Sequence, residues 1–181
     1  WPLLVFGECR MALSYNRPTN PNPLSPVGYD FFIESLPSVN WFITAVNLPG
    51  ITLGEAAFPT PFIDTAVAGD TLVFEPINIS FIIDEDLQNW REIYDWMAGI
   101  GFPHDFNEYA ALKAKKPAIY SDASLIILNS HMNANYKFTF KEMFPTSLSA
   151  VQFDSSDTSL ETIKADVSFR YLTYTYEKIG S

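Results

Sequence analysis

The chain has 181 residues, and 11 Lys and Arg against 21 Asp and Glu give a formal net charge of −10. Hydrophobic residues make up 48% and aromatic residues 15%, so the chain has enough apolar surface for a substantial core and is not a disordered protein. The acidic excess argues against a protein that grips nucleic acid by its phosphates. A single cysteine, Cys9, excludes a disulfide framework and a zinc site built on paired cysteines.

Residues 1–28 are expected to form an N-terminal extension and arm, and residues 29–181 a single domain. The apolar stretch 1–7 is too short to span a membrane and lacks the basic start and cleavage site of a signal peptide, so no membrane insertion is expected. Residues 17–26 contain four prolines and favour an extended conformation. This segment is either a linker or an arm that lies along a neighbouring subunit.

Alternating apolar and polar residues predict seven or eight strands. The predicted strands cover residues 29–36, 39–47, 77–84, 123–129, 136–143, 148–153 and 162–176. Residues 51–67 contain Pro59 and Pro61, which indicates an irregular hairpin or a long loop outside the core. Because no β-α-β rhythm appears, the sequence predicts a mainly β fold, a sandwich or barrel with one flanking α-helix.

The flanking helix is predicted over residues 86–98. Trp90, Tyr94 and Met97 recur at helical spacing, and this stripe is expected to face the core. Gly99 and Gly101 are expected to end the helix.

The sequence offers little for catalysis. His104 is followed by three possible ligands in 105–108, but neighbouring Gly and Pro favour a solvated loop. The run Asp84-Glu85-Asp86 lacks the glycine and the later glutamate of a calcium loop, and instead predicts a helix cap. The basic cluster 113–116 is either a solvated loop or a contact with an acidic neighbouring subunit. We expect no enzyme activity, no catalytic residue, no metal and no cofactor.

A series of short motifs occurs in a fixed order along the chain. They are Leu48-Pro49-Gly50, Val67-Ala68-Gly69-Asp70, Ile83-Asp84-Glu85, Tyr94-Asp95-Trp96-Met97, Phe144-Pro145-Thr146 and Val151-Gln152-Phe153-Asp154. In this order the chain resembles the tail tube protein family of contractile-tailed bacteriophages, over roughly residues 29–176. The same fold serves baseplate tube-initiating proteins and the tubes of type VI secretion systems.

The resemblance implies a structural protein of the virion tail, assembled in the host cytoplasm. Its subunits would form homo-hexameric rings that stack into a tube inside a contractile sheath. Its partners would be sheath and baseplate proteins, and genomic DNA would pass through the lumen on ejection without specific binding. Two alternatives stay open: a baseplate tube-initiator ring of the same fold, and an aromatic-rich β-sandwich binding module, for example for carbohydrate.

Two sets of residues are candidates for assembly. The excursion after the second predicted strand suits ring stacking or other contacts between subunits, through Phe58, Pro59, Phe62, Gly69 and Asp70. Gly69 is expected to permit a tight turn. The alternative is that the apolar members fold back on their own core.

The polar face of the last predicted strand is expected to line the lumen, through Glu161, Lys164, Asp166, Ser168 and Arg170. The alternative is an ordinary solvated sheet face. Six copies at −10 each carry −60 per ring, and an acidic wall would repel phosphates and let DNA slide. This mechanism requires the excess acid to face the lumen.

Overall fold

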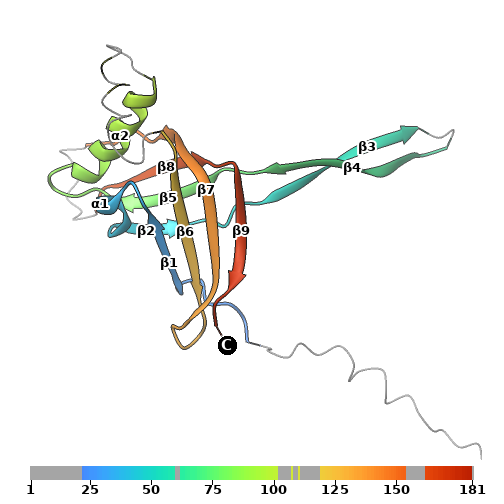
Figure 1. The fold of residues 1–181 in the computed structure, drawn as a ribbon, viewed down its shortest axis with the longest axis horizontal. Helices are drawn as coiled ribbons and strands as arrows, with labels where there is room; N and C mark the ends of the chain where they lie inside the picture. The colour runs from blue at the N-terminus through green and yellow to red at the C-terminus, as the bar shows by residue number, and fades with distance from the viewer. Residues whose placement is uncertain are drawn as a thin grey trace, which may run out of the picture.

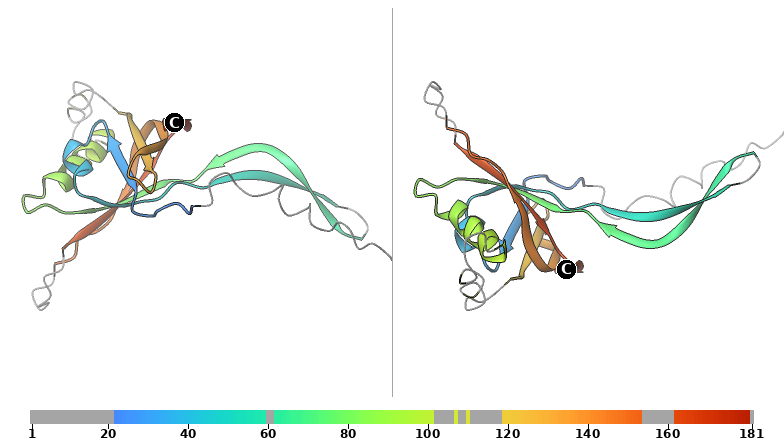
Figure 2. Two further views of the ribbon diagram at one scale, coloured as in Figure 1. Left: turned by 90° about the horizontal axis from the view of Figure 1, so that it is seen from below. Right: turned by 90° about the horizontal axis from the view of Figure 1, so that it is seen from above.

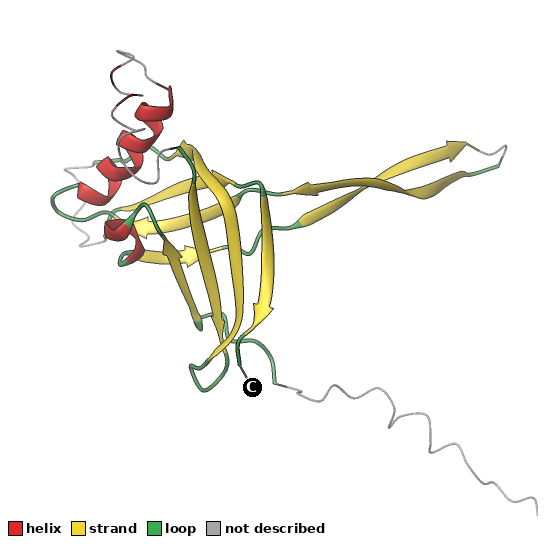
Figure 3. Cartoon of the chain, viewed as in Figure 1, coloured by secondary structure: helices red, strands yellow, loops and turns green. Residues whose placement is uncertain are grey.

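The computed structural model of the chain describes residues 22–59, 62–101, 107, 110, 119–153 and 162–180. These residues form a mainly β structure with flanking helices, which confirms the fold class expected from the sequence (Figure 1; Figure 3). The elements in chain order are β1 (Tyr29–Ile33), α1 (Pro37–Asn40), β2 (Ile43–Val46), β3 (Ile51–Pro59), β4 (Asp64–Phe74), β5 (Ile77–Ile82), α2 (Gln88–Gly101), β6 (Ser121–Leu128), β7 (Ala134–Leu148), β8 (Lys164–Arg170) and β9 (Thr173–Lys178).

The long strand β7 belongs to two sheets. Its first part lies between β6 and β9, and with β1 these strands form the first sheet. Its last residues pair with β8, and with β5 and β2 these form the second sheet. Between the two parts, Glu142 has a positive φ of 55°, next to a register shift against β6. Such a bulge bends a strand, and this one carries β7 from one sheet into the other.

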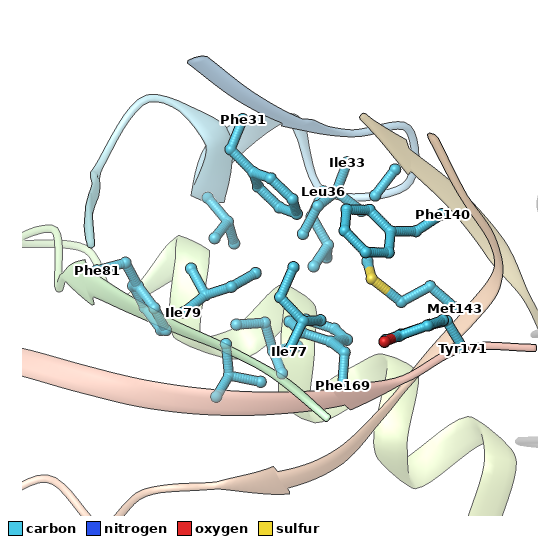
Figure 4. Packing of buried hydrophobic residues seen from close by; sticks show 14 of the residues in the cluster. Phe31, Ile33, Leu36, Ile77, Ile79, Phe81, Phe140, Met143, Phe169 and Tyr171 are labelled. Atoms are coloured by element: carbon cyan, nitrogen blue, oxygen red, sulfur yellow. The ribbon is translucent and has the colours of Figure 1, made fainter. Parts of the chain in front are cut away.

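The core lies between the inner faces of the two sheets and the helices (Figure 4). Ile77, Ile79 and Phe81 of β5 are fully buried, as the alternation along this strand predicts. Val167 and Phe169 of β8 are buried in the same way and follow the same period of two. A third layer comes from α1 and α2, which cover the side of the core that the sheets leave open.

The orientation of α2 is fixed by a buried polar side chain. Asn89 is fully buried, and its amide group donates to the carbonyl of Ile82 (2.8 Å). Ile93 and Trp96 therefore point into the core. Of the predicted stripe, Trp90 and Met97 lie partly buried against the core. Tyr94 does not.

Tyr94 is 45% exposed and stacks on the ring of Trp90, with centroids 5.5 Å apart. The expectation that Tyr94 faces the core is therefore wrong. The side chain that takes the core position is Trp96, whose indole N–H donates to the carbonyl of Ile119 (3.0 Å). The helix also runs through Gly99, which is buried, and extends to Gly101, beyond the predicted range 86–98.

The predicted strand 39–47 is a helical turn followed by a short strand. Pro37 occupies the first turn of α1, where its missing N–H costs nothing. Asn40 then acts as a backbone substitute: its amide donates to the carbonyl of Ile33, and its side-chain oxygen accepts from the N–H of Ile33 (both 2.9 Å). These local bonds favour the turn over an extended strand. Trp41, directly after this turn, is 86% exposed.

The segment 51–67 lies in a hairpin made of β3 and β4 whose register shifts between Leu53 and Glu55, so it is an irregular hairpin, one of the two forms expected for it. Two other segments differ from the expected strands. The described residues 149–153 contain no strand, because β7 ends at Leu148. The alternation over 162–176 is divided between two strands, β8 and β9. The extended conformation is interrupted at Tyr171 and Leu172, where the chain crosses from the second sheet to the first.

Candidate assembly surfaces

The hairpin of β3 and β4 projects away from the body of the molecule (Figure 1; Figure 2). Its strands form a sheet of their own, and both faces of this sheet carry exposed apolar side chains. The exposed apolar residues are Ile51, Leu53, Phe58, Phe62, Ile63, Val67, Leu72 and Val73. An isolated hairpin is marginally stable in water, and exposed apolar surface of this extent marks a contact with another protein.

Phe58, Pro59 and Phe62 lie at the far end of the hairpin. Phe58 is 64% exposed and Phe62 is 99% exposed, and Pro59 is the exposed last residue of β3. These residues do not fold back on their own core, so that alternative is wrong. Their aromatic rings are available to a neighbouring molecule.

Gly69 does not form the predicted tight turn. It lies inside β4 at a position where β4 advances four residues, from Leu72 to Ala68, while β3 advances two, from Leu53 to Glu55. A Cβ atom on Gly69 would lie 2.6 Å from the carbonyl oxygen of Gly54. The glycine is therefore required by the close approach of two strands at a bulge, not by a positive φ.

Asp70 is exposed in the same bulge, and the hydroxyl of Thr71 donates to its carboxylate (3.3 Å). A bulge increases the local twist of a hairpin, and the strands twist about each other in the middle of the arm (Figure 1).

An aromatic cluster anchors the base of the hairpin to the body. Phe74, the last residue of β4, contacts the rings of Tyr171 and Tyr174 at centroid distances of 6.0 and 5.5 Å. The hydroxyl of Tyr171 donates to the carbonyl of Glu75 (2.9 Å). Burial, followed by the charges of Tyr174 and Glu75, raises the pKa of Tyr171 to about 12. This cluster has no local signal in the sequence, because Phe74 lies far along the chain from Tyr171 and Tyr174.

The outer face of the second sheet is polar. Lys164, Asp166, Ser168 and Arg170 alternate with the buried residues of β8 and point away from the core. Glu161, the fifth lumen candidate, lies outside the described residues. The alternation predicted for this strand is thus present, although it leaves open which surroundings the polar face meets.

Hydroxyl and amide groups on this face bind one another. Ser80 donates to the carboxylate of Asp166, and Ser168 donates to the side-chain oxygen of Asn78. The hydroxyl of Thr146 donates to the carbonyl of Ser168 (3.0 Å). The polar side chains of this face therefore form many of their hydrogen bonds with one another.

The described residues offer no group of three or more His, Cys, Asp or Glu in a position to hold a metal ion. Among the same residues, no helix has the length and apolar character needed to cross a membrane. His104, Cys9 and the cluster 113–116 lie outside the described residues. Asp84 has the expected capping role, since its carboxylate accepts from the N–H of Gln88 at the start of α2 (2.8 Å).

Comparisons with known proteins place the chain in a class. The family model described as "Phage tail tube protein" matches residues 16–177. The tail tube terminator protein of Enterobacteria phage T4 is 28% identical over 113 residues, which is 62% of this chain. The chain spans 61% of the length of that relative.

Two solved structures with similar chains have terminators or caps in their titles. One is the sheath/tube terminator of an extracellular contractile injection system (TM-score 0.61, 14% identity, 86% of this chain and 97% of that chain). The other is the anti-feeding prophage cap (TM-score 0.58, 14% identity, 93% and 99%). A chain in the sheath–tube complex of the same injection system is also similar (TM-score 0.56, 12% identity, 88% and 94%).

The fold and the matched family define a structural protein of the phage tail tube class. The chain belongs to the phage tail tube protein family.

Proposed function

We propose that this chain forms a hexameric ring at the end of a tail tube, as a tube terminator. The second sheet is the main support for the proposed ring. Its strands run antiparallel in the order β2-β5-β8-β7, with one buried face and one polar face. Its outer strands, β2 and the end of β7, run in opposite directions. The β2 strand of one copy can therefore pair antiparallel with the end of β7 in the next, and a closed ring leaves no free edge.

In such a ring the polar face of the second sheet lines the lumen. The face would present Lys164, Asp166, Ser168 and Arg170, which is two cations and one anion from β8. This supports a polar lumen that lets DNA pass without specific binding, but it gives no support to the acidic wall expected from the net charge. The excess of Asp and Glu must therefore lie on other surfaces of the molecule.

The similarity to the terminator of phage T4, and to chains in two structures titled as terminator or cap, supports the end of the tube as the position of this ring. The hairpin of β3 and β4 would then reach the adjoining ring, with Phe58 and Phe62 in the contact. Sheath and baseplate proteins of the tail, assembled in the host cytoplasm, are the further partners in this proposal.

The second candidate is the main tube subunit, supported by the similarity to a chain of a sheath–tube complex. Size-exclusion chromatography with light scattering and negative-stain electron microscopy of the purified chain separate the two. Single hexameric rings support the terminator, and long tubes support the tube subunit. A monomer at every concentration contradicts both.

Val46→Pro tests the edge pairing. The N–H of Asn47 donates to the carbonyl of Asn78, so the N–H of Val46 points away from β5 and toward the free edge. Proline there should abolish the ring and leave the β2–β5 ladder intact. Val46→Ala is the matched control, because it removes the same core packing without blocking the edge. Rings of Val46→Pro would contradict the pairing.

A further inference from the structure

The charges of this chain are unevenly distributed along the sequence. Residues 18–90 contain nine Asp and Glu and no Lys, Arg or His. The rest of the chain contains 12 Asp and Glu and all 11 Lys and Arg, so it is close to neutral. Nearly the whole net charge of −10 therefore lies on the segment that includes the projecting hairpin and the loop before α2.

The hairpin combines exposed apolar surface with negative charge alone. Glu55, Asp64 and Asp70 are all exposed on it, among side chains such as Phe58 and Val67. The ion pair found within the described residues joins Lys137 to Glu177 on the first sheet, and the hairpin takes no part in it. A surface that covers this arm must be apolar and must supply Lys or Arg, because buried carboxylates require charged partners.

The opposite end of the molecule is also acidic. The loop 83–87 lies at the end farthest from the hairpin (Figure 1; Figure 2) and carries Asp84, Glu85 and Asp86. Along the first half of α2, the carboxylates of Asp86, Glu92 and Asp95 line a pocket together with Gln88 and Arg91. Among the described residues, the loop 83–87, which a following copy would present to the hairpin, thus carries only negative charge.

Identical copies stacked in one direction always bring one end of a molecule against the opposite end of the next. In this chain such a stack sets the carboxylates of the hairpin against those of 84–86, and like charges at an interface are unfavourable. We infer that the hairpin docks on a basic, apolar surface of a different protein subunit, and that its acidic far end keeps further copies of this chain from adding. This inference rests on the proposed ring and names the chemistry of its partner.

The test uses a variant of this chain whose loop 83–87 is made basic, so that the variant itself takes the place of the basic partner. Glu85→Lys with Asp86→Lys makes that end basic and leaves Asp84, which caps α2, in place. Asp30→Lys with Glu34→Lys is the matched control, because it changes the net charge equally at exposed positions of β1 and the turn after it. Stacking is measured by sedimentation velocity and electron microscopy in about 50 mM and about 500 mM NaCl.

The wild type and the Asp30→Lys/Glu34→Lys control are expected to remain single rings. The Glu85→Lys/Asp86→Lys variant is expected to stack at low salt and to dissociate at high salt. Adding Glu55→Lys and Asp64→Lys to that variant should abolish stacking, since the hairpin then becomes basic as well.

Rings that stack equally well in the wild type, the variant and the control would overturn this inference and leave the ring proposal standing. Rings of the Glu85→Lys/Asp86→Lys variant that fail to stack at low salt would overturn it too. Monomers in every sample would overturn the ring proposal and this inference together.

Discussion

The hydroxyl of Tyr171 donates to the carbonyl of Glu75 across 2.9 Å and ties the connection between β8 and β9 to the base of the hairpin. We predict that Tyr171→Phe, which keeps the ring contacts with Phe74 and Phe140, lowers the free energy of unfolding by about 1 kcal/mol. Urea unfolding measures this loss. Tyr176→Phe is the control, because Tyr176 is 71% exposed, and an equal loss in both variants would contradict the role of the bond.

The same tyrosine predicts a pH dependence of stability. Its pKa rises from 10.0 to about 12 on folding, so the folded state favours the neutral phenol. This contribution is complete below pH 10 and is lost as the pH rises toward 12. The stability advantage of the wild type over Tyr171→Phe should therefore shrink across this range, as measured by urea unfolding at each pH. A constant advantage would contradict the prediction.

Gly69→Ala is predicted to disturb the hairpin, because its Cβ would lie 2.6 Å from the carbonyl oxygen of Gly54. The strands must move apart, and we expect faster hydrogen exchange of β3 and β4 with little change in the body. Gly101→Ala is the control, since a Cβ there meets nothing within 4 Å. Unchanged exchange in the Gly69 variant would show that the bulge adapts without cost.

Phe62→Asp is predicted to weaken assembly without affecting folding. The side chain is 99% exposed, so the free energy of unfolding should change by less than about 0.5 kcal/mol. Binding of the ring to tail tubes, measured by co-sedimentation, should fall. Phe153→Asp is the control, because Phe153 is also exposed (74%) but lies outside the hairpin. Equal effects of both substitutions would argue against the hairpin contact.

Trp96→Ala and Tyr94→Ala test the orientation of α2. Trp96 is 6% exposed and contacts Phe169, so its loss should cost about 3–5 kcal/mol of stability. Tyr94→Ala should cost about 1 kcal/mol or less, since its ring is half exposed on Trp90. Thermal or urea unfolding ranks the two variants, and the reverse order would contradict the rotation described for the helix.

The sequence by itself determined the mainly β fold and most of the buried strand positions. Ile77, Phe81 and Val167 follow a period of two, and burying one face of a sheet forces this period on the residues. It also located the helix and its Asp84 cap, because both are local features of the chain. The resemblance to tail tube proteins depended on the order of motifs, which a sequence carries directly.

Only the tertiary structure decided which face of α2 is buried and why a glycine is required at Gly69. Asn89 sets the rotation of the helix through a bond to Ile82, and the helical spacing of Tyr94 fits more than one rotation. Gly69 is explained by the carbonyl of Gly54 on the facing strand, a contact that depends on register. The fold alone shows that the carboxylates of the hairpin and those of the loop 83–87 lie at opposite ends of the molecule. This placement matters because the repulsion between copies depends on the distances between their charges.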